Sequence, residues 1–254
     1  MTQIVTEVAQ RVLRIEIARP EKRNALTGPM YDAMSDALEA AERDPAIRVA
    51  LIHGARDCFT AGNDLKDFLD RPPHDEASPA FRFIRRIAVF TKPLIAAVNG
   101  AAVGIGTTLL LHCELAYAAP GARFQLPFVS LGLVPEAGSS FLLPYTAGYQ
   151  RAAELLLLAQ PFGVEKALAA GLITEVIPEA ELLDHARNAA LAVAALPPAA
   201  VQQAKALMKQ RFAARTAEAM AEEGAVFRER LASPEAKEAM TAFFEKRKPD
   251  FSRF

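Results

Sequence analysis

The chain has 254 residues, of which 52% are hydrophobic and 23% are charged, and its formal net charge is -1. These values are ordinary for a globular protein, and the length predicts one domain with a large core and a helical appendage. The charge balance disfavours nucleic acid as the main partner, because proteins that bind it usually carry a basic surface. A nucleic-acid-binding function therefore receives little support.

The chain carries no sequence signal for export, membrane insertion or metal binding. Its first residues, Met1–Glu7, do not form a basic region followed by an apolar one, so secretion is not expected. The longest apolar runs are interrupted by Gly, Pro or polar residues and are too short for a membrane span. Cys58 and Cys113 form neither a metal-type pair nor a disulfide framework, which is typical of a reducing compartment. We therefore expect a cytoplasmic protein without a membrane span, a bound metal or a nucleic-acid partner.

Hydrophobic periodicity predicts a repeating pattern of strands and helices in the first half of the chain. The expected elements are a hairpin of strands at 4–8 and 12–18, a helix at 29–43 with Thr27 as its cap, a strand at 47–53, a helix at 80–91, a strand at 94–99 and a helix at 107–112. Glycine-containing segments at 59–64 and 100–106 follow the expected strands at 47–53 and 94–99. A polar, Pro-rich loop is expected at 70–79. The recurrence of strand, turn and helix every ~45 residues favours a stacked ββα arrangement over a Rossmann sheet.

The region after Pro197-Pro198 is predicted to be helical throughout, with segments at 202–212, 216–231 and 235–246. The exposed faces of these segments are strongly charged. We interpret residues 1–196 as the core and residues 197–254 as a helical C-terminal subdomain.

Glu136 is the one charged residue between Arg123 and Arg151, in a stretch that is otherwise largely apolar. A carboxylate in such surroundings is unfavourable unless it is paired, exposed on a loop or kept at a raised pKa for proton transfer. Glu136 is therefore a candidate general base, and the alternative is a carboxylate that caps a helix. The apolar neighbours would raise its pKa and a helix start after Pro135 would lower it, and the sequence leaves open which effect is larger.

Two glycine turns are candidates for binding a negative charge. Ala61-Gly62-Asn63-Asp64 and Gly104-Ile105-Gly106 each follow a predicted buried strand and precede a helix. Free backbone N–H groups at such a position favour an anion, and two turns brought together would form an oxyanion hole. Taken singly, each is better explained as a tight turn that needs Gly for steric reasons. Gly104-Ile105-Gly106 lacks the residues of a phosphate loop and the spacing of a dinucleotide fingerprint.

Four motifs in this order resemble the crotonase superfamily, also called the enoyl-CoA hydratase/isomerase family. They are Arg19–Leu26, Phe59–Leu65, Lys92–Gly106 and Ala169–Ile173. The resemblance covers most of the chain and is weakest in the C-terminal helices. It implies an α/β fold with a ββα spiral core and a helical C-terminal trimerisation region, so that the protein would be a homotrimer or a dimer of trimers. It also implies that the substrate is an acyl-CoA thioester and that no further cofactor is needed.

The same resemblance implies roles for individual residues. The thioester oxygen would accept hydrogen bonds from the N–H groups of Asn63 and Ile105. The groove for CoA would be lined by Lys22, Arg23, Ala25, Leu26, Ala61, Asp64 and Leu65, with Lys248 as a further candidate for contact with a CoA phosphate.

The chain departs from the family pattern where hydratases carry two glutamates that activate water. Those places hold Thr108 and Phe128, and neither side chain can ionise as an acid. Glu136 instead matches the Pro-Glu-Gly/Ala-x-Ser-Ser pattern of the peroxisomal-type Δ3,Δ2-enoyl-CoA isomerases. The favoured hypothesis is an enoyl-CoA isomerase in which Glu136 moves a proton from C2 to C4. Two alternatives stay open: a hydratase or another crotonase-type lyase or hydrolase, and a non-catalytic acyl-CoA-binding protein.

Overall fold

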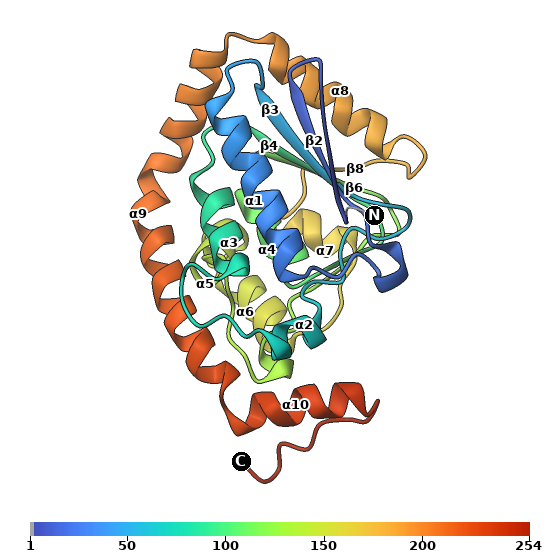
Figure 1. Cartoon of the computed structure of the whole chain (residues 1–254), viewed down its shortest axis with the longest axis vertical. Helices are drawn as coiled ribbons and strands as arrows, with labels where there is room; N and C mark the ends of the chain where they lie inside the picture. The colour runs from blue at the N-terminus through green and yellow to red at the C-terminus, as the bar shows by residue number, and fades with distance from the viewer. Residues whose placement is uncertain (1–2) are drawn as a thin grey trace.

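The computed structural model describes residues 3–254 (Figure 1). Met1 and Thr2 lie outside this range. They belong to the segment Met1–Glu7, in which no secretion signal is expected. The strands are β1 (Ile4–Ala9), β2 (Val12–Ile17), β3 (Val49–Gly54), β4 (Leu94–Val98), β5 (Ala101–Val103), β6 (Leu115–Ala118), β7 (Arg123–Gln125) and β8 (Glu175–Val176). The α-helices are α1 (Gly28–Arg43), α2 (Leu65–Asp70), α3 (Pro79–Val89), α4 (Ile105–Thr108), α5 (Ser139–Ala147), α6 (Tyr149–Leu158), α7 (Val164–Ala169), α8 (Leu182–Ala195), α9 (Pro198–Leu231) and α10 (Pro234–Phe244). Short 3-10 helices are η1 (Pro20–Lys22), η2 (Leu109–His112) and η3 (Val129–Leu131).

The larger sheet orders its strands β1-β2-β3-β4-β6-β8. β1 and β2 pair antiparallel, and the other neighbouring strands pair parallel. The turn between β1 and β2 holds Gln10 and Arg11 at positive φ of 50° and 70°, a geometry that suits tight hairpin turns. The predicted N-terminal hairpin is therefore confirmed.

Helices cover both faces of this sheet (Figure 1). On one face, Ala186 of α8 belongs to the same apolar cluster as Leu51 of β3. On the other face, Met34 of α1 and Phe83 of α3 share a cluster with Ile52. β3 and β4 are buried along their whole length, as expected of central parallel strands.

A second, two-stranded parallel sheet is formed by β5 and β7. β4 leads into β5 and then into α4 and η2, while β6 leads into β7 and then η3. Each of these two passes thus adds one strand to each sheet before a helical segment follows, and the pass through β3 adds only an isolated bridge from Thr60 to Ala102. This repetition confirms the predicted stack of ββα turns.

Several predicted boundaries were wrong in detail. The helices expected at 202–212 and 216–231 are one continuous helix, α9, because the intervening Ala213-Ala214-Arg215 consists of good helix formers. The helix expected at 107–112 begins earlier, at Ile105, and changes to a 3-10 helix at Leu109. Thr27 occupies the N-cap position of α1, but its side chain makes no capping hydrogen bond.

α9 runs along the outside of the molecule, past α3 and α5, and ends near α10 (Figure 1). Near its start, the buried Lys205 Nζ donates to the carbonyl oxygen of Lys92 at 2.6 Å and pairs with Glu114 at 2.9 Å. These bonds attach α9 to the core beside the segment that carries α4 and η2. None of the helices within residues 3–254 combines the length and apolarity needed to cross a bilayer.

Candidate active site

The structure brings the two glycine turns together through backbone pairing. The N–H of Thr60 donates to the carbonyl oxygen of Ala101 at 2.9 Å, and the N–H of Val103 donates to that of Thr60 at 3.0 Å. Gly62 has φ of +85°, and a Cβ there would lie 2.8 Å from the carbonyl oxygen of Val103. The close approach therefore requires Gly62, as the steric interpretation of this turn expected.

The backbone N–H groups of Asn63 and Ile105 both lack an acceptor among residues 3–254. Asn63 follows Gly62, and Ile105 is the first residue of α4, where helix geometry leaves the N–H without an intrahelical partner. Because Thr60 is hydrogen-bonded to both the first and the last residue of β5, the two turns lie next to each other. Two unpaired donors so placed can donate hydrogen bonds to one ligand oxygen, which is the requirement for an oxyanion hole.

Glu136 is buried, with 6% of its surface exposed. Thr108 Oγ1, from α4, donates a hydrogen bond of 2.5 Å to its Oε1. The other oxygen, Oε2, is buried and has no hydrogen-bond partner among the described residues. Burial raises the pKa of Glu136 to about 8, with a further increase from the charge of Glu223, while the Thr108 hydrogen bond opposes the shift. The sequence left open whether burial or the nearby helix start has the larger effect on the pKa of Glu136. In the structure the effect of burial is the larger.

Glu136 does not cap the helix that follows it. The N-terminal N–H groups of that region are bound by Glu223 of α9, which accepts from Gly138 at 2.6 Å and from Ser140 at 2.8 Å. Burial raises the pKa of Glu223, and these hydrogen bonds oppose that shift. The carboxylate that stabilises the start of α5 thus comes from a helix more than eighty residues away, which leaves Glu136 available for another role.

The turn after Glu136 is held in an unusual backbone conformation. Ala137 has φ of +61°, which is uncommon for a residue with a Cβ, and Gly138 has φ of +71°. The His112 ring nitrogen Nε2 lies 2.7 Å from the carbonyl oxygen of Ala137. Burial and the nearby Lys209 lower the pKa of His112 to about 4, so the ring is neutral near pH 7 and can donate this bond through Nε2–H. His112 therefore helps to fix the backbone that presents Glu136.

Tyr31 is a part of the site that sequence reasoning missed. Its hydroxyl donates a 2.5 Å hydrogen bond to the Asn63 side-chain oxygen. Burial raises the pKa of Tyr31, and the charge of Glu136 raises it further, which places this phenol near the carboxylate. On the predicted helix at 29–43, Tyr31 adjoins the apolar face marked by Met30 and Met34, so it resembled a core residue.

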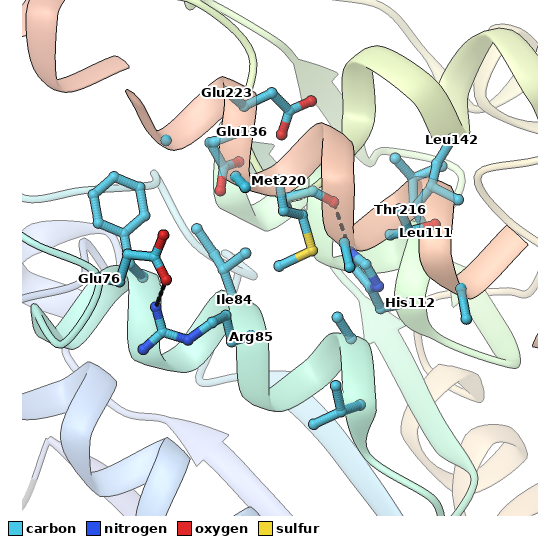
Figure 2. A pocket seen from close by; sticks show the side chains of 18 of the residues that line it. Glu76, Ile84, Arg85, Leu111, His112, Glu136, Leu142, Thr216, Met220 and Glu223 are labelled. Carbon is cyan, nitrogen blue, oxygen red and sulfur yellow. Dashed lines mark hydrogen bonds and ion pairs between the residues drawn. The ribbon is translucent and has the colours of Figure 1, made fainter. Parts of the chain in front are cut away.

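A cavity of about 240 Å³ opens beside Glu136 (Figure 2). Its walls are mainly apolar and come from α3, η2, α5 and α9, with Ile84, Leu111, Leu142 and Met220 as examples. An acyl chain needs an apolar cavity of this kind that reaches the reacting atoms.

The segments expected to line a CoA groove lie side by side. The N–H of Leu26 donates to the carbonyl oxygen of Gly62, and that of Asp64 donates to Leu26, both at 2.8 Å. The structure joins the predicted residues Lys22, Arg23, Ala25 and Leu26 to Ala61, Asp64 and Leu65 in this way. Lys248 is exposed beyond α10, and no hydrogen bond or ion pair joins its side chain to these segments in the described part of the chain. The assignments to CoA stay predictions.

Asp64 has a structural role at this place. Its carboxylate accepts a 2.7 Å hydrogen bond from Arg19 and caps α2 by accepting from the N–H groups of Lys66 and Asp67. Burial alone would raise the pKa of Asp64, but these hydrogen bonds outweigh it and lower the pKa. Asp64 therefore fixes the loop that carries Asn63.

The two places where hydratases carry glutamates are both buried in this protein. Thr108 binds Glu136, as described, and Phe128 packs in the main apolar core just before η3. Neither place contributes an acid to the cavity.

Comparison with known proteins agrees with this geometry. A model of the enoyl-CoA hydratase/isomerase family matches residues 7–253. The chain is 34% identical over 254 residues to the 2,3-dehydroadipyl-CoA hydratase of Escherichia coli K12, with 99% of both proteins covered. It is also 34% identical over 243 residues to human enoyl-CoA delta isomerase 2, which is 93% of this chain and 61% of that protein.

A solved structure shares the whole fold. The enoyl-CoA hydratase/isomerase from Pseudoalteromonas atlantica T6c superposes with a TM-score of 0.94 at 41% identity, covering 98% of this chain and 100% of that one. The similar proteins include both hydratases and isomerases, so they identify the family without deciding the reaction. With its four motifs, its ββα spiral and this match over nearly its full length, the chain belongs to the enoyl-CoA hydratase/isomerase family, the crotonase superfamily.

Proposed function

We propose that this protein is an enoyl-CoA isomerase that moves a double bond from C3 to C2 of an acyl-CoA. The observation that carries the proposal is the buried Oε2 of Glu136, a residue that lines the cavity, because this oxygen has no hydrogen-bond partner among residues 3–254. The other acids that line the cavity already have partners. Glu76 pairs with Arg85 at 3.1 Å, and Glu223 holds two N–H groups at the start of α5.

In this mechanism Glu136 Oε2 removes a proton from C2 of the 3-enoyl thioester. The electron pair of the broken C–H bond moves into a dienolate, and its negative charge lies mainly on the thioester oxygen. The N–H groups of Asn63 and Ile105 would stabilise that oxygen as the charge develops. Glu136 then returns the same proton to C4, so that the double bond lies between C2 and C3 and no other reactant is consumed.

The environment of Glu136 suits both halves of this reaction. A pKa of about 8 lies close to neutral pH, so the carboxylate can accept a proton and the acid can release it without a large energy difference. The Thr108 hydroxyl fixes one oxygen and leaves the other without a hydrogen-bond partner among residues 3–254. Thr108 also stands where hydratases have their first glutamate, which supports isomerisation over addition of water.

The decisive assay compares two reactions of the purified protein. Isomerisation of 3-hexenoyl-CoA and hydration of 2-hexenoyl-CoA are measured side by side. We expect isomerisation to dominate, and Glu136→Gln to lower its kcat by about 100- to 10,000-fold, the usual contribution of a general base. Glu229→Gln, an exposed change on α9, serves as the matched control and should leave the rate unchanged.

Three results would contradict the proposal. Unchanged isomerisation in Glu136→Gln would refute the role of this carboxyl. Hydration much faster than isomerisation would favour a hydratase, the activity named for the Escherichia coli relative. Tight acyl-CoA binding without turnover of either substrate would favour a non-catalytic binding protein.

A further inference from the structure

The cavity beside Glu136 has three cationic side chains in its lining: Arg85, Lys209 and Arg228. Arg85 pairs with Glu76 at 3.1 Å. Lys209 lies 3.6 Å from Glu114 and 3.4 Å from the carbonyl oxygen of His112. Within residues 3–254, Arg228 differs from both, because its Nη1 is buried without any hydrogen-bond partner.

Arg228 contributes to the cavity lining from α9. Thr216, Met220, Gly224 and Arg228 follow each other at four-residue intervals, and all four line the cavity. Helical side chains lean toward the N-terminus of their helix, and Arg228 does so: its Nη1 lies 3.5 Å from where a Cβ on Gly224 would be. The guanidinium carbon also lies 5.7 Å from the centre of the Phe81 ring on α3. The guanidinium is thus held between α9 and α3 within the cavity wall.

A buried guanidinium nitrogen without an acceptor is unfavourable, because it has lost its water and gained no hydrogen bond. The acids of the lining do not supply the acceptor. Glu76 and Glu223 are bound to other groups, as described above, and Glu136 is held by Thr108. The missing acceptor is therefore expected on the ligand, and a carboxylate matches the planar fork of a guanidinium best.

We propose that Arg228 binds a carboxylate carried by the acyl chain, so that the substrates are CoA thioesters of unsaturated dicarboxylic acids. This inference rests on the proposed function for the location of the acyl chain and deepens it by naming the substrate class. Phe81 supports the arrangement, since its ring face attracts the guanidinium and limits its movement. Apolar side chains of the lining, among them Ile84 and Met220, would contact the methylene groups.

Binding of saturated ligands tests the proposal without depending on turnover. Hexanoyl-CoA is compared with adipyl-CoA, and octanoyl-CoA with suberyl-CoA, by titration calorimetry, so that chain length is matched within each pair. We expect the ligand with the terminal carboxylate to bind about tenfold more tightly or better, the effect of one charge-assisted hydrogen bond or more. Equal affinity in both pairs, or a preference for the uncharged chain, would overturn the proposal.

Two variants assign the preference to Arg228. In Arg228→Gln the ratio of affinities should fall toward one, while Arg215→Gln, an exposed change on the same helix, should keep the wild-type ratio. A preference that survives in a folded Arg228→Gln protein, as checked by its circular dichroism, would overturn the assignment. If that variant does not fold, Arg228→Lys, which keeps the charge and loses the planar fork, should retain only part of the preference.

Rates separate this inference from the proposed function. Isomerisation of 3-hexenoyl-CoA without any preference for 3-hexenedioyl-CoA would refute the role of Arg228 and leave the isomerase intact. A tenfold preference for adipyl-CoA in a protein that isomerises neither substrate would support the role of Arg228 and refute the isomerase.

Discussion

The buried carboxyl of Glu136 makes the stability of the protein depend on pH in an unusual direction. Its pKa is about 8 in the folded protein, against an ordinary value of 4.5. Between these two values the folded protein binds more protons than the unfolded chain. The contribution of Glu136 to the free energy of unfolding therefore falls as pH rises from about 4.5 through about 8, and this contribution changes no further above that range. At 1.36 kcal/mol per pKa unit, the whole effect amounts to about 5 kcal/mol.

Glu136→Gln removes this dependence because the amide is neutral at every pH. Near pH 5 the protonated acid and the amide have similar shape and no charge, so wild type and variant should be similarly stable. Near pH 9 the variant should be the more stable protein, by up to about 5 kcal/mol. Most proteins with a perturbed carboxyl show the opposite sign, since their acids are stabilised in the charged form.

Urea unfolding at a series of pH values from about 5 to about 9 measures the difference directly. The same series with Glu229→Gln, which is exposed on α9, provides the background expected of a simple loss of charge. A difference between wild type and Glu136→Gln that stays constant across this range would refute the reasoning. So would a difference that grows in favour of wild type as pH rises.

Three further changes test the surroundings of the carboxyl. Thr108→Val removes the hydrogen bond that lowers the pKa of Glu136, so the pH profile of kcat/KM should shift to higher pH. Glu223→Gln should shift the same profile to lower pH, because it removes a charge that raises that pKa. It should also destabilise the protein by about 2 kcal/mol in urea unfolding, since an amide offers one acceptor oxygen to the two N–H groups at the start of α5. Tyr31→Phe frees the Asn63 side chain and should lower kcat by about tenfold in the isomerase assay, with a smaller change in KM.

The strands and the spiral could be predicted because their signals are local. β2 alternates buried and less buried residues, and β3 and β4 are apolar runs, so period and composition identify them. The single helix α9 could not be predicted in the same way. Many of its buried positions are polar or small, including Lys205, Thr216, Glu223 and Gly224, so no continuous apolar stripe marks it.

Residues of the candidate site could be predicted only where the local sequence around them is chemically unusual. Glu136 was identified because a lone acid in an apolar stretch is unusual. Tyr31, Glu223 and Arg228 carry no such signal, because a tyrosine beside an apolar helix face and charges on a long helix are ordinary. The fold brings Tyr31 to Asn63 across 32 positions and Glu223 to Gly138 across 85, and no local pattern encodes those contacts.

The arrangement of acids around the cavity bears on the choice between isomerisation and hydration. Water addition by two acids would need a second carboxylate that can turn toward the substrate. Glu223 is the nearest candidate, since its charge acts on Glu136, but turning it inward would break both of its N–H bonds and release the start of α5. That turn also carries Glu136, so the movement that supplies the second acid would disturb the first. Moving one proton between C2 and C4 needs only the free oxygen of Glu136, which the Thr108 hydrogen bond leaves unpaired.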